Sequence, residues 1–267
     1  EYEIQTKCTQ PLAITTDPDG NVWFAQVNTG KVAKFDPNTE SFTEYENPGW
    51  PPKARSMMWG IAYSPDGSLW FTDEAHDSVW KFSIEDGKYD RHGYPSTGDA
   101  LPQRLEISGS QIIINDFTGN KITFLDPASQ SADETAYRVI ASPLENSFTG
   151  SFAVDSDDNI WYTNWQFRQG GALIKFDQKS YFEASALAKD AGVPLFDFIK
   201  VFQLPAMNAP NGISVGNDGI VWIADTSSSF FYSFDPLTKN FTKYITSKPD
   251  ISSYGNATGL IKTPVSG

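Results

Sequence analysis

Polar turn residues lead into an unbroken run of apolar positions at four places along the chain. The first is DPDGNVWF at 17–24, which SPDGSLWF at 64–71 nearly repeats; looser copies are DSDDNIWY at 155–162 and GNDGIVWI at 216–223. Because neighbouring side chains of a strand point to opposite faces, such a run must be covered on both faces. The Asp-Gly pair favours the positive φ of a hairpin turn. Each copy therefore predicts a tight turn followed by a doubly covered strand.

This apolar run is one of three features that recur in fixed order five times. Its central position is held by Trp23, Trp70, Ile113, Trp161 and Trp222, at spacings of 43 to 61 residues. A KFDP-like motif follows each run, and a proline closes each unit. In the first unit, four strands are predicted at 11–16, 21–26, 31–36 and 41–46. Four antiparallel strands with a doubly covered second strand are typical of a β-propeller blade, and such repeats are about 40–45 residues long.

We therefore predict an all-β fold, a β-propeller of four-stranded antiparallel blades in a single domain over residues 1–267. Five complete blades are expected at about 8–48, 56–95, 101–143, 149–205 and 209–249. Residues 1–6 resemble 43–48 and are expected to form an outer closing strand, and 250–267 to begin a further, incomplete blade. The intact protein is accordingly expected to have six or seven blades. The alternative is an irregular five-bladed ring closed by residues 250–267.

The fourth unit differs from the others by an insertion at residues 178–198. Within it, residues 181–190 predict a short helix, ended by Gly192 and Pro194. An insertion at the rim of a propeller serves as decoration, as a lid or as a docking element, and the sequence leaves these alternatives open.

The repeat PLAITTDPDGNVWFAQVNTGKVAKFDPNTESFTEY, at 11–45, resembles that of streptogramin (virginiamycin B) lyases. PNGISVGNDGIVWIADT, at 210–226, is similar to gluconolactonase and NHL-type propellers. The resemblance covers nearly the whole chain at the level of the blade. It implies the fold more strongly than the function, because the repeated residues are structural ones.

Ligands of a propeller are expected on the face where the first strands begin and the loops after the second strands open. The candidate ligand-binding residues at these two positions are Gln26, Trp59, Arg104, Asp116 and Asn164. The end of the second strand is polar in every unit. Two explanations stay open: these side chains hydrogen-bond a neighbouring loop and hold the blades together, or their oxygens bind a hard divalent cation.

The resemblance to gluconolactonases implies a metal held by Glu, Asn and Asp side chains. Asn211 and Asp225 are the candidate ligands, and Ca²⁺ or Mg²⁺ is the expected ion. No organic cofactor is expected.

The resemblance to streptogramin lyases implies a histidine where a first strand begins, and a glutamate with a second histidine where the next strand ends. Elimination needs such a base and a metal that stabilises the developing enolate. The first of these positions reads Leu12, Trp59, Gln103, Gly150 and Asn211, without a histidine. His76 and Glu74, in the loop after the second strand of unit two, remain the catalytic candidates; a solvated loop histidine is the alternative. His92 is expected on an exposed outer strand.

Trp50, Trp59 and Trp165 lie outside the repeated position, in predicted loops or where the channel-facing residues are expected. Exposed tryptophans stack on ligands or anchor protein partners, whereas a buried tryptophan packs under a loop.

The formal net charge is −13, and an acidic protein repels phosphate backbones, so no nucleic-acid partner is expected. No apolar run approaches the ~18 residues of a membrane-spanning helix, so no membrane span is expected either. The chain begins at Glu1 rather than Met, and Asn240 and Asn256 begin glycosylation sequons. An extracellular, periplasmic or cell-surface location is therefore expected.

Two classes of function remain. In the first, the chain is an exported module that binds a small molecule or a protein on the channel face, without catalysis. In the second, it is a metal-dependent C–O lyase or lactonase acting on a cyclic ester.

Overall fold

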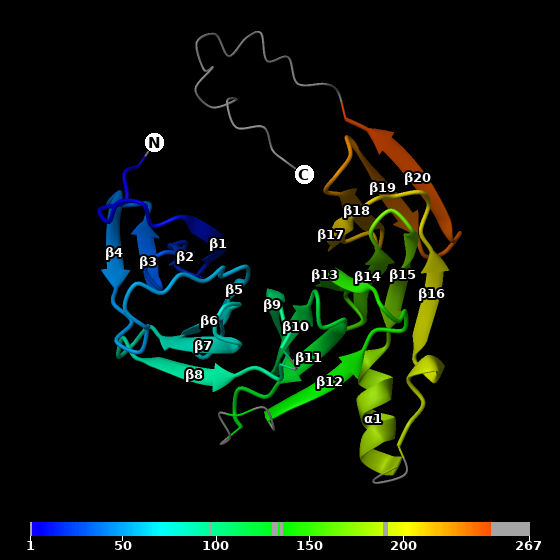
Figure 1. Cartoon of the computed structure of the whole chain (residues 1–267), viewed down its shortest axis with the longest axis horizontal. Helices are drawn as coiled ribbons and strands as arrows, with labels where there is room; N and C mark the ends of the chain where they lie inside the picture. The colour runs from blue at the N-terminus through cyan, green and yellow to red at the C-terminus, as the bar shows by residue number, and fades with distance from the viewer. Residues whose placement is uncertain (1, 97, 130–132, 134–135, 189–191, 247–267) are drawn as a thin grey trace. The chain divides into compact units, whose positions relative to one another are not determined.

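The computed structural model describes residues 2–96, 98–129, 133, 136–188 and 192–246. These residues form twenty strands in five four-stranded antiparallel sheets and one α-helix (Figure 1). In every sheet the strands follow one another in chain order from edge to edge. The architecture is the predicted β-propeller, and the sheets are called blades 1 to 5 in chain order.

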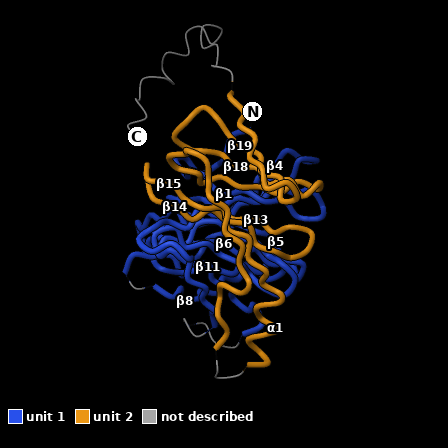
Figure 2. The backbone as a smooth tube through the Cα atoms, turned by 90° about the vertical axis from the view of Figure 1, so that its right-hand side faces the viewer, with its two compact units in different colours: residues 1–151 blue, residues 152–267 orange. Residues whose placement is uncertain are grey.

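Blades 1 to 3 lie in a first compact unit, Glu1–Ser151, which is blue in Figure 2. Blade 1 consists of β1 (Pro11–Thr16), β2 (Val22–Gln26), β3 (Lys31–Asp36) and β4 (Ser41–Tyr45). Blade 2 consists of β5 (Ile61–Ser64), β6 (Ser68–Asp73), β7 (Ser78–Ser83) and β8 (Tyr89–Gly93). Blade 3 consists of β9 (Pro102–Ser108), β10 (Gln111–Asp116), β11 (Lys121–Leu125) and β12 (Tyr137–Ala141).

The second compact unit is Phe152–Gly267, orange in Figure 2. Blade 4 consists of β13 (Phe148–Val154), which begins in the last residues of the first unit, β14 (Ile160–Gln166), β15 (Gly170–Phe176) and β16 (Ile199–Gln203). Blade 5 consists of β17 (Pro210–Val215), β18 (Val221–Asp225), β19 (Phe230–Asp235) and β20 (Asn240–Ile245). The helix α1 (Gln178–Ala188) and a short 3-10 helix (Leu195–Asp197) stand between β15 and β16.

The four strands predicted for the first repeat, which is blade 1, are confirmed to within one residue at each end. The helix in the insertion is confirmed as well, but it begins three residues earlier than predicted. The reason is a helix cap: the Asp177 carboxylate accepts a hydrogen bond from the Ser180 amide at 3.0 Å, which satisfies a free donor of the first turn. Residues 189–191, where the predicted helix ends, lie outside the described residues.

The predicted outer strand at residues 1–6 is wrong for the part that the structure describes, because residues 2–6 form no strand. Thr6 uses its hydroxyl and amide to donate to the Glu44 carboxylate, at 2.5 and 3.3 Å. These contacts hold the segment by side chains at β4 instead of by a strand ladder. Residues 250–267, the expected start of a further blade, lie outside the described residues.

Each blade has two faces, and the face that carries the repeated tryptophan is called the tryptophan face. The tryptophan face packs on the opposite face of the next blade at three boundaries. Trp23 shares a hydrophobic cluster with Leu69 and Phe71 of blade 2. Trp70 lies with Ile112 and Ile114 of blade 3, and Trp161 with Val221 and Ile223 of blade 5. The second strand of blade 2 is thus covered on both faces, as the sequence predicts, whereas Trp222 on the second strand of blade 5 is 37% exposed.

The turn before the tryptophan strand is held by an aspartate in blades 1 and 4. Asp17 accepts hydrogen bonds from the Trp23 indole at 2.8 Å and from the Asn21 amide at 2.9 Å. Asp155 accepts the same pair of bonds, from the Trp161 indole at 2.8 Å and the Asn159 amide at 2.9 Å. One carboxylate therefore closes the hairpin and satisfies the buried indole N–H. The turn glycine Gly20 has a φ of 83°, the left-handed conformation that the Asp-Gly pair predicts.

His92 on β8 is buried and not exposed as expected. Its ring lies 5.1 Å from that of Trp70. Burial lowers the pKa of His92, against the opposing influence of Asp90. The tryptophan face of blade 2 thus extends to β8, which a strand read in isolation does not reveal.

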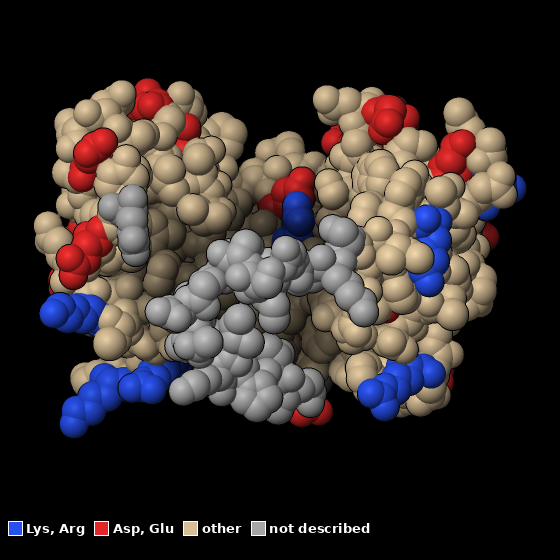
Figure 3. All heavy atoms as spheres, turned by 90° about the horizontal axis from the view of Figure 1, so that it is seen from above, with Lys and Arg blue, Asp and Glu red and all other residues tan. Residues whose placement is uncertain are grey.

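Charged side chains are interspersed with uncharged ones on the face shown in Figure 3. In the part of the chain that the structure describes, no helix has the length and apolar character needed to cross a membrane.

Candidate functional site

The polar residues at the end of the second strands are all buried. They are Gln26, Asp73, Asp116, Asn164 and Asp225. Their partners bear on the two explanations that the sequence leaves open.

Asp225 is held by the loop before its blade and by the turn after β18. Its carboxylate accepts hydrogen bonds from the amides of Asn208 at 2.8 Å, Ala209 at 3.1 Å and Ser227 at 3.0 Å. Burial raises the pKa of Asp225, but these hydrogen bonds lower it by more than burial raises it. The pKa of Asp225 therefore lies below the usual value. Both oxygens of this carboxylate therefore tie loop to strand.

Asp116 has the same role in blade 3, whereas the Gln26 side chain in blade 1 ties β2 to β4 and to the turn after β2. Asp116 accepts hydrogen bonds from the amides of Leu101 at 2.8 Å and Gly119 at 2.9 Å. The Gln26 amide donates to Glu44 at 2.9 Å and accepts from the Thr29 hydroxyl at 3.0 Å. Their burial and these bonds favour the structural explanation for this position. Asn164 on β14 is buried as well, and ligand contact by these side chains stays a prediction.

His76 pairs with the buried residue at the corresponding position of blade 2. Its Nδ1 lies 2.8 Å from Asp73 Oδ1, and Asp73 also accepts from the Trp80 indole at 2.9 Å. The His76 ring meets that of Trp50 edge-on at 5.1 Å. Because Asp73 engages Nδ1, the other ring nitrogen is the one available to solvent or ligand. The structure thus orients the imidazole. The corresponding positions in blades 1 and 3, however, hold residues that only tie strand, turn and loop together.

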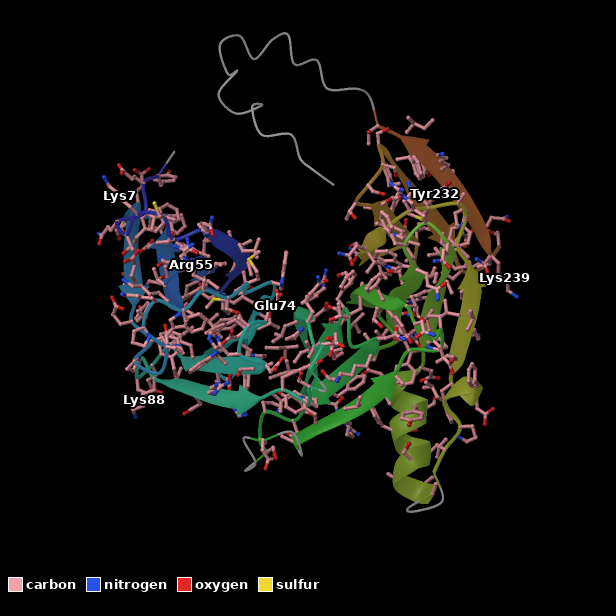
Figure 4. All side chains as sticks on the ribbon, viewed as in Figure 1. Lys7, Arg55, Glu74, Lys88, Tyr232 and Lys239 are labelled. Carbon is pink, nitrogen blue, oxygen red and sulfur yellow. The ribbon has the colours of Figure 1, made fainter. Side chains whose placement is uncertain are left out.

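Trp59 is the exposed aromatic residue of this region, with 38% of its surface accessible. Its indole donates to the Glu74 carboxylate at 2.6 Å. Two further bonds join the same segments, from the Glu74 amide to the Met57 carbonyl at 3.3 Å and from the Ala75 amide to the Ser56 hydroxyl at 2.9 Å. Glu74 lies at the β5 side of blade 2, away from the β7–β8 turn that carries Lys88 (Figure 4). Trp59 is therefore exposed and yet fixed in orientation.

Arg104 is the neighbour of Trp59 on the first strand of blade 3. A Cβ atom on Gly60 would lie 2.5 Å from the Gln103 carbonyl oxygen and 2.6 Å from the Leu105 nitrogen. Position 60 needs a glycine because its backbone touches the backbone of β9. This close approach brings Trp59, the residue before Gly60, beside Arg104. The guanidinium donates to Glu106 at 3.1 Å.

Met57 completes this exposed surface, because its carbonyl accepts the hydrogen bond from the Glu74 amide. Its side chain is exposed, while the next residue, Met58, is buried. We call the surface formed by Met57, Trp59, Glu74 and Arg104 the Trp59 surface. The sequence singled out Trp59, Glu74 and Arg104 but missed Met57. Met57 lies in an irregular segment, and no sequence pattern indicates which side chains of such a segment are exposed.

The other two tryptophan candidates are less open. Trp165 lies on β14 and is buried. Trp50 covers Gly30, where a Cβ atom would lie 2.1 Å from its ring, and donates to the Ala54 carbonyl at 3.2 Å. Of the three candidates, Trp59 alone offers an open ring.

Asn211 and Asp225 supply few free oxygens for a metal ion. Within the described ranges, Asn211 Oδ1 is buried without a hydrogen-bond partner, whereas Asp225 is engaged by three amides. No cluster of three His, Cys, Asp or Glu side chains suited to a metal occurs among the described residues. Because Ca²⁺ takes 6–8 oxygens, this pair does not fit the ion by itself. The metal stays a prediction.

The chain matches the model of the virginiamycin B lyase family over residues 1–195. No curated protein matches its sequence.

Solved structures of lyases share its fold. A streptogramin B lyase structure matches with a TM-score of 0.70 and 22% identity, over 93% of this chain and 72% of that one. Catalytically inactive virginiamycin B lyase from Staphylococcus aureus, solved with quinupristin, matches with a TM-score of 0.70 and 21% identity, over 92% and 73%. The extracellular domain of a B. thetaiotaomicron protein, described as a one component system, matches with a TM-score of 0.63 and 15% identity, over 90% and 32%.

Proposed function

The chain belongs to the virginiamycin B lyase family, and we propose that it serves as a binding module of that family, with the Trp59 surface as its ligand site. One observation carries the proposal: the Trp59 ring is exposed and is held by a 2.6 Å hydrogen bond to Glu74. An aromatic ring fixed before binding loses little conformational entropy when a ligand stacks on it.

The ligand class follows from the chemistry of the surface. Trp59 and Met57 offer apolar contact, and Arg104 and Glu74 border them with opposite charges. Such a surface suits a ring-bearing, partly apolar molecule with a few hydrogen-bonding groups. Quinupristin, present in a solved structure of a lyase with this fold, is the probe we choose.

Calorimetric titration of the chain with quinupristin tests the proposal. We expect saturable binding that Trp59→Ala weakens at least tenfold, about 1.4 kcal/mol. Glu74→Gln keeps the ring but loosens its anchor, so its effect is smaller. Trp222→Ala is the matched control, because Trp222 in blade 5 is 37% exposed and lies outside the Trp59 surface. Equal affinity of the wild type and Trp59→Ala contradicts this site.

A catalytic role is the second candidate, and the His76–Asp73 pair favours it. A carboxylate at 2.8 Å from Nδ1 orients the imidazole and supports a base at its other nitrogen. A C–O lyase opens a cyclic ester without a change of mass, so chromatographic retention of quinupristin is the readout, with and without Ca²⁺ or Mg²⁺. A product that forms with the wild type and not with His76→Asn favours the enzyme. Unchanged quinupristin that still binds favours the module.

An extracytoplasmic location belongs to the same proposal. The extracellular domain of a B. thetaiotaomicron protein shares this fold, and the sequon residue Asn240 is exposed at the start of β20. Fractionation of cells that express the full gene, followed by immunoblotting, tests the location. Recovery of the chain with cytoplasmic markers contradicts it.

A further inference from the structure

The insertion between β15 and β16, which carries α1 (Figure 1), helps to form a small cavity on blade 4. The cavity has a volume of about 140 Å³. Its polar lining residues are Asn159, Lys175, Asp177, Asp197 and Lys200. Asp197 and Lys200 belong to the segment by which the insertion returns to the blade, whereas Lys175 lies on β15. The insertion thus brings further charged residues to a position that already carries a lysine.

Two of these lysines lie side by side. Lys175 on β15 and Lys200 on β16 are direct partners in the antiparallel ladder, so their side chains leave the same face of the sheet at neighbouring positions. Like charges directly opposite each other destabilise a sheet. An anionic group bound between the two ammonium groups would remove this repulsion.

The same pair of positions in blades 1 and 2 holds no such repulsion. Lys34 of blade 1 lies opposite Thr43, and Lys81 of blade 2 lies opposite Asp90. Each of these lysines lies over the repeated tryptophan of its own blade, 5.9 and 5.5 Å from the ring centroid, as Lys175 does at 5.4 Å. The lysine on the third strand therefore belongs to the repeat, whereas the lysine opposite it is a feature of blade 4.

The two ammonium groups of blade 4 are poorly neutralised within the fold. Lys175 lies 3.8 Å from the Asp155 carboxylate, which already accepts hydrogen bonds from the Trp161 indole at 2.8 Å and the Asn159 amide at 2.9 Å. Among the residues that the structure describes, no carboxylate forms an ion pair with Lys200. A bound anionic group therefore meets two positive charges that need a partner.

The cavity also offers negative charge, from Asp177 and Asp197. The Asp177 carboxylate caps α1 through the hydrogen bond from the Ser180 amide. A simple anion would satisfy the lysines but would meet these carboxylates, whereas a ligand that carries both a carboxylate and an ammonium group satisfies both signs of charge. The volume is far below the roughly 300–1,000 Å³ of pockets for drug-sized ligands. A ligand of few heavy atoms is therefore favoured.

We propose that this cavity binds a small zwitterion, an α-amino acid with a short side chain. The carboxylate of the ligand lies between Lys175 and Lys200. Its ammonium group faces Asp177 and Asp197. Binding relieves the repulsion between the two lysines, so the ligand stabilises the folded chain. The site shares no residue with the Trp59 surface, and the two are tested independently.

Calorimetric titration with L-alanine tests the proposal. The wild type is expected to bind it saturably and to melt at a higher temperature when saturated. Lys200→Ala removes a partner of the ligand carboxylate, and Asp197→Asn removes a partner of its ammonium group. Each variant is expected to weaken binding by at least about tenfold. Both residues are exposed, and circular dichroism establishes that the variants are folded.

Two residues of α1 supply matched controls. Lys179→Ala and Glu183→Gln each remove one charge, of opposite sign, at exposed positions that do not line the cavity. Both variants are expected to bind L-alanine as the wild type does. Weakened binding in both would assign the effect to overall charge and would contradict the site.

Lys200→Asp separates loss of the site from damage to the blade. It gives blade 4 the arrangement of Lys81 and Asp90 in blade 2. Without ligand, the variant is expected to melt at a higher temperature than the wild type, because an opposite-charge pair replaces a like-charge pair. It is also expected to lose the binding of L-alanine. A lower melting temperature of this variant contradicts the repulsion on which the proposal rests.

Acetate, methylamine and phosphate probe the class of ligand. Acetate and methylamine each carry one of the two charges and are expected to bind at least about tenfold more weakly than L-alanine. The proposal is overturned if L-alanine does not bind saturably, or if it binds Lys200→Ala and Asp197→Asn as it binds the wild type. Acetate or phosphate that binds as tightly as L-alanine also overturns it and indicates a site for simple anions. None of these results bears on the Trp59 surface, whose test is the binding of quinupristin.

Discussion

Blades 1 and 2 lie in the same unit and have nearly the same turn sequence, but they satisfy their buried tryptophans differently. In blade 1, Asp17 accepts the Trp23 indole hydrogen at 2.8 Å. In blade 2 the corresponding residue is Ser64, and in the described part of the chain the Trp70 Nε1 atom is buried without a hydrogen-bond partner. Asp66, two positions on, pairs with Lys81 at 2.9 Å instead.

The difference teaches that the packed indole ring and its hydrogen bond are separable. Trp23 and Trp70 are both almost fully buried, so the propeller keeps the ring even where no acceptor is available. A buried polar group without a partner costs about 1–3 kcal/mol. Blade 2 retains that cost and is stabilised by packing, whereas blade 1 removes it with one carboxylate.

The largest expected effect comes from removing that carboxylate. Asp17→Ala leaves the Trp23 indole and the Asn21 amide without their acceptor, and is expected to lower the free energy of unfolding by about 1–3 kcal/mol. Ser64→Ala at the same position of blade 2 is the control and is expected to lower it less, since it removes the hydrogen bond of Ser64 to Asp66 but none to the indole. Urea unfolding followed by tryptophan fluorescence measures both. Equal losses would show that the aspartate contributes no more than the serine.

Replacing the rings by phenylalanine is expected to sharpen the comparison with a smaller difference. Trp23→Phe and Trp70→Phe remove similar volume, but only Trp23→Phe also breaks a hydrogen bond. We expect Trp23→Phe to cost more, by about 1 kcal/mol. The same urea titrations measure this difference, and a larger loss for Trp70→Phe contradicts our account.

Acid is expected to weaken blade 1 through Asp17. Burial raises the pKa of Asp17, but hydrogen bonds from Trp23 and Asn21 lower it more, so the folded pKa lies below the unfolded one. The contribution is therefore fully present above about pH 4. It is lost as pH falls from there through the folded pKa. A protonated carboxyl still accepts a hydrogen bond, so the loss is smaller than that of Asp17→Ala. Thermal unfolding between pH 5 and pH 2 is expected to show a shallower decline for Asp17→Asn than for the wild type.

The smallest expected effect concerns His92, which lies against Trp70 in blade 2. Because burial lowers its pKa, protonation favours the unfolded state. Stability is thus highest above about pH 6.5, the unfolded value. It declines as pH falls from there toward the folded pKa. His92→Gln is expected to flatten the pH dependence of the melting temperature in this range, and an unchanged slope contradicts the assignment.

Much of the fold could be predicted because it is written in local patterns. The turn glycines and the doubly apolar strands located the blades, and β1 and β3 were predicted without error. The start of α1 was missed by three residues, because Asp177 was not recognised as its cap. The strand at residues 1–6 was predicted from similarity to 43–48, but a strand needs a partner edge, and local similarity does not supply one.

The candidate site could be predicted only in part. Polarity at the end of each second strand was visible in the sequence, whereas the burial of Asp116 and Asp225 was not. Likewise, the sequence gives no reason to prefer one of Trp50, Trp59 and Trp165 as a ligand contact. Only their exposure in the structure distinguishes them.

The sequence by itself determined the repeat, the order of strands within a blade and the membership of a propeller family, because turns and alternating side chains depend on residues close together in the chain. The tertiary structure decided which polar side chains close loops, which tryptophan stays open and which blade faces are covered. Those outcomes depend on what another blade places against each residue, and such contacts join positions tens of residues apart, where no local pattern records them.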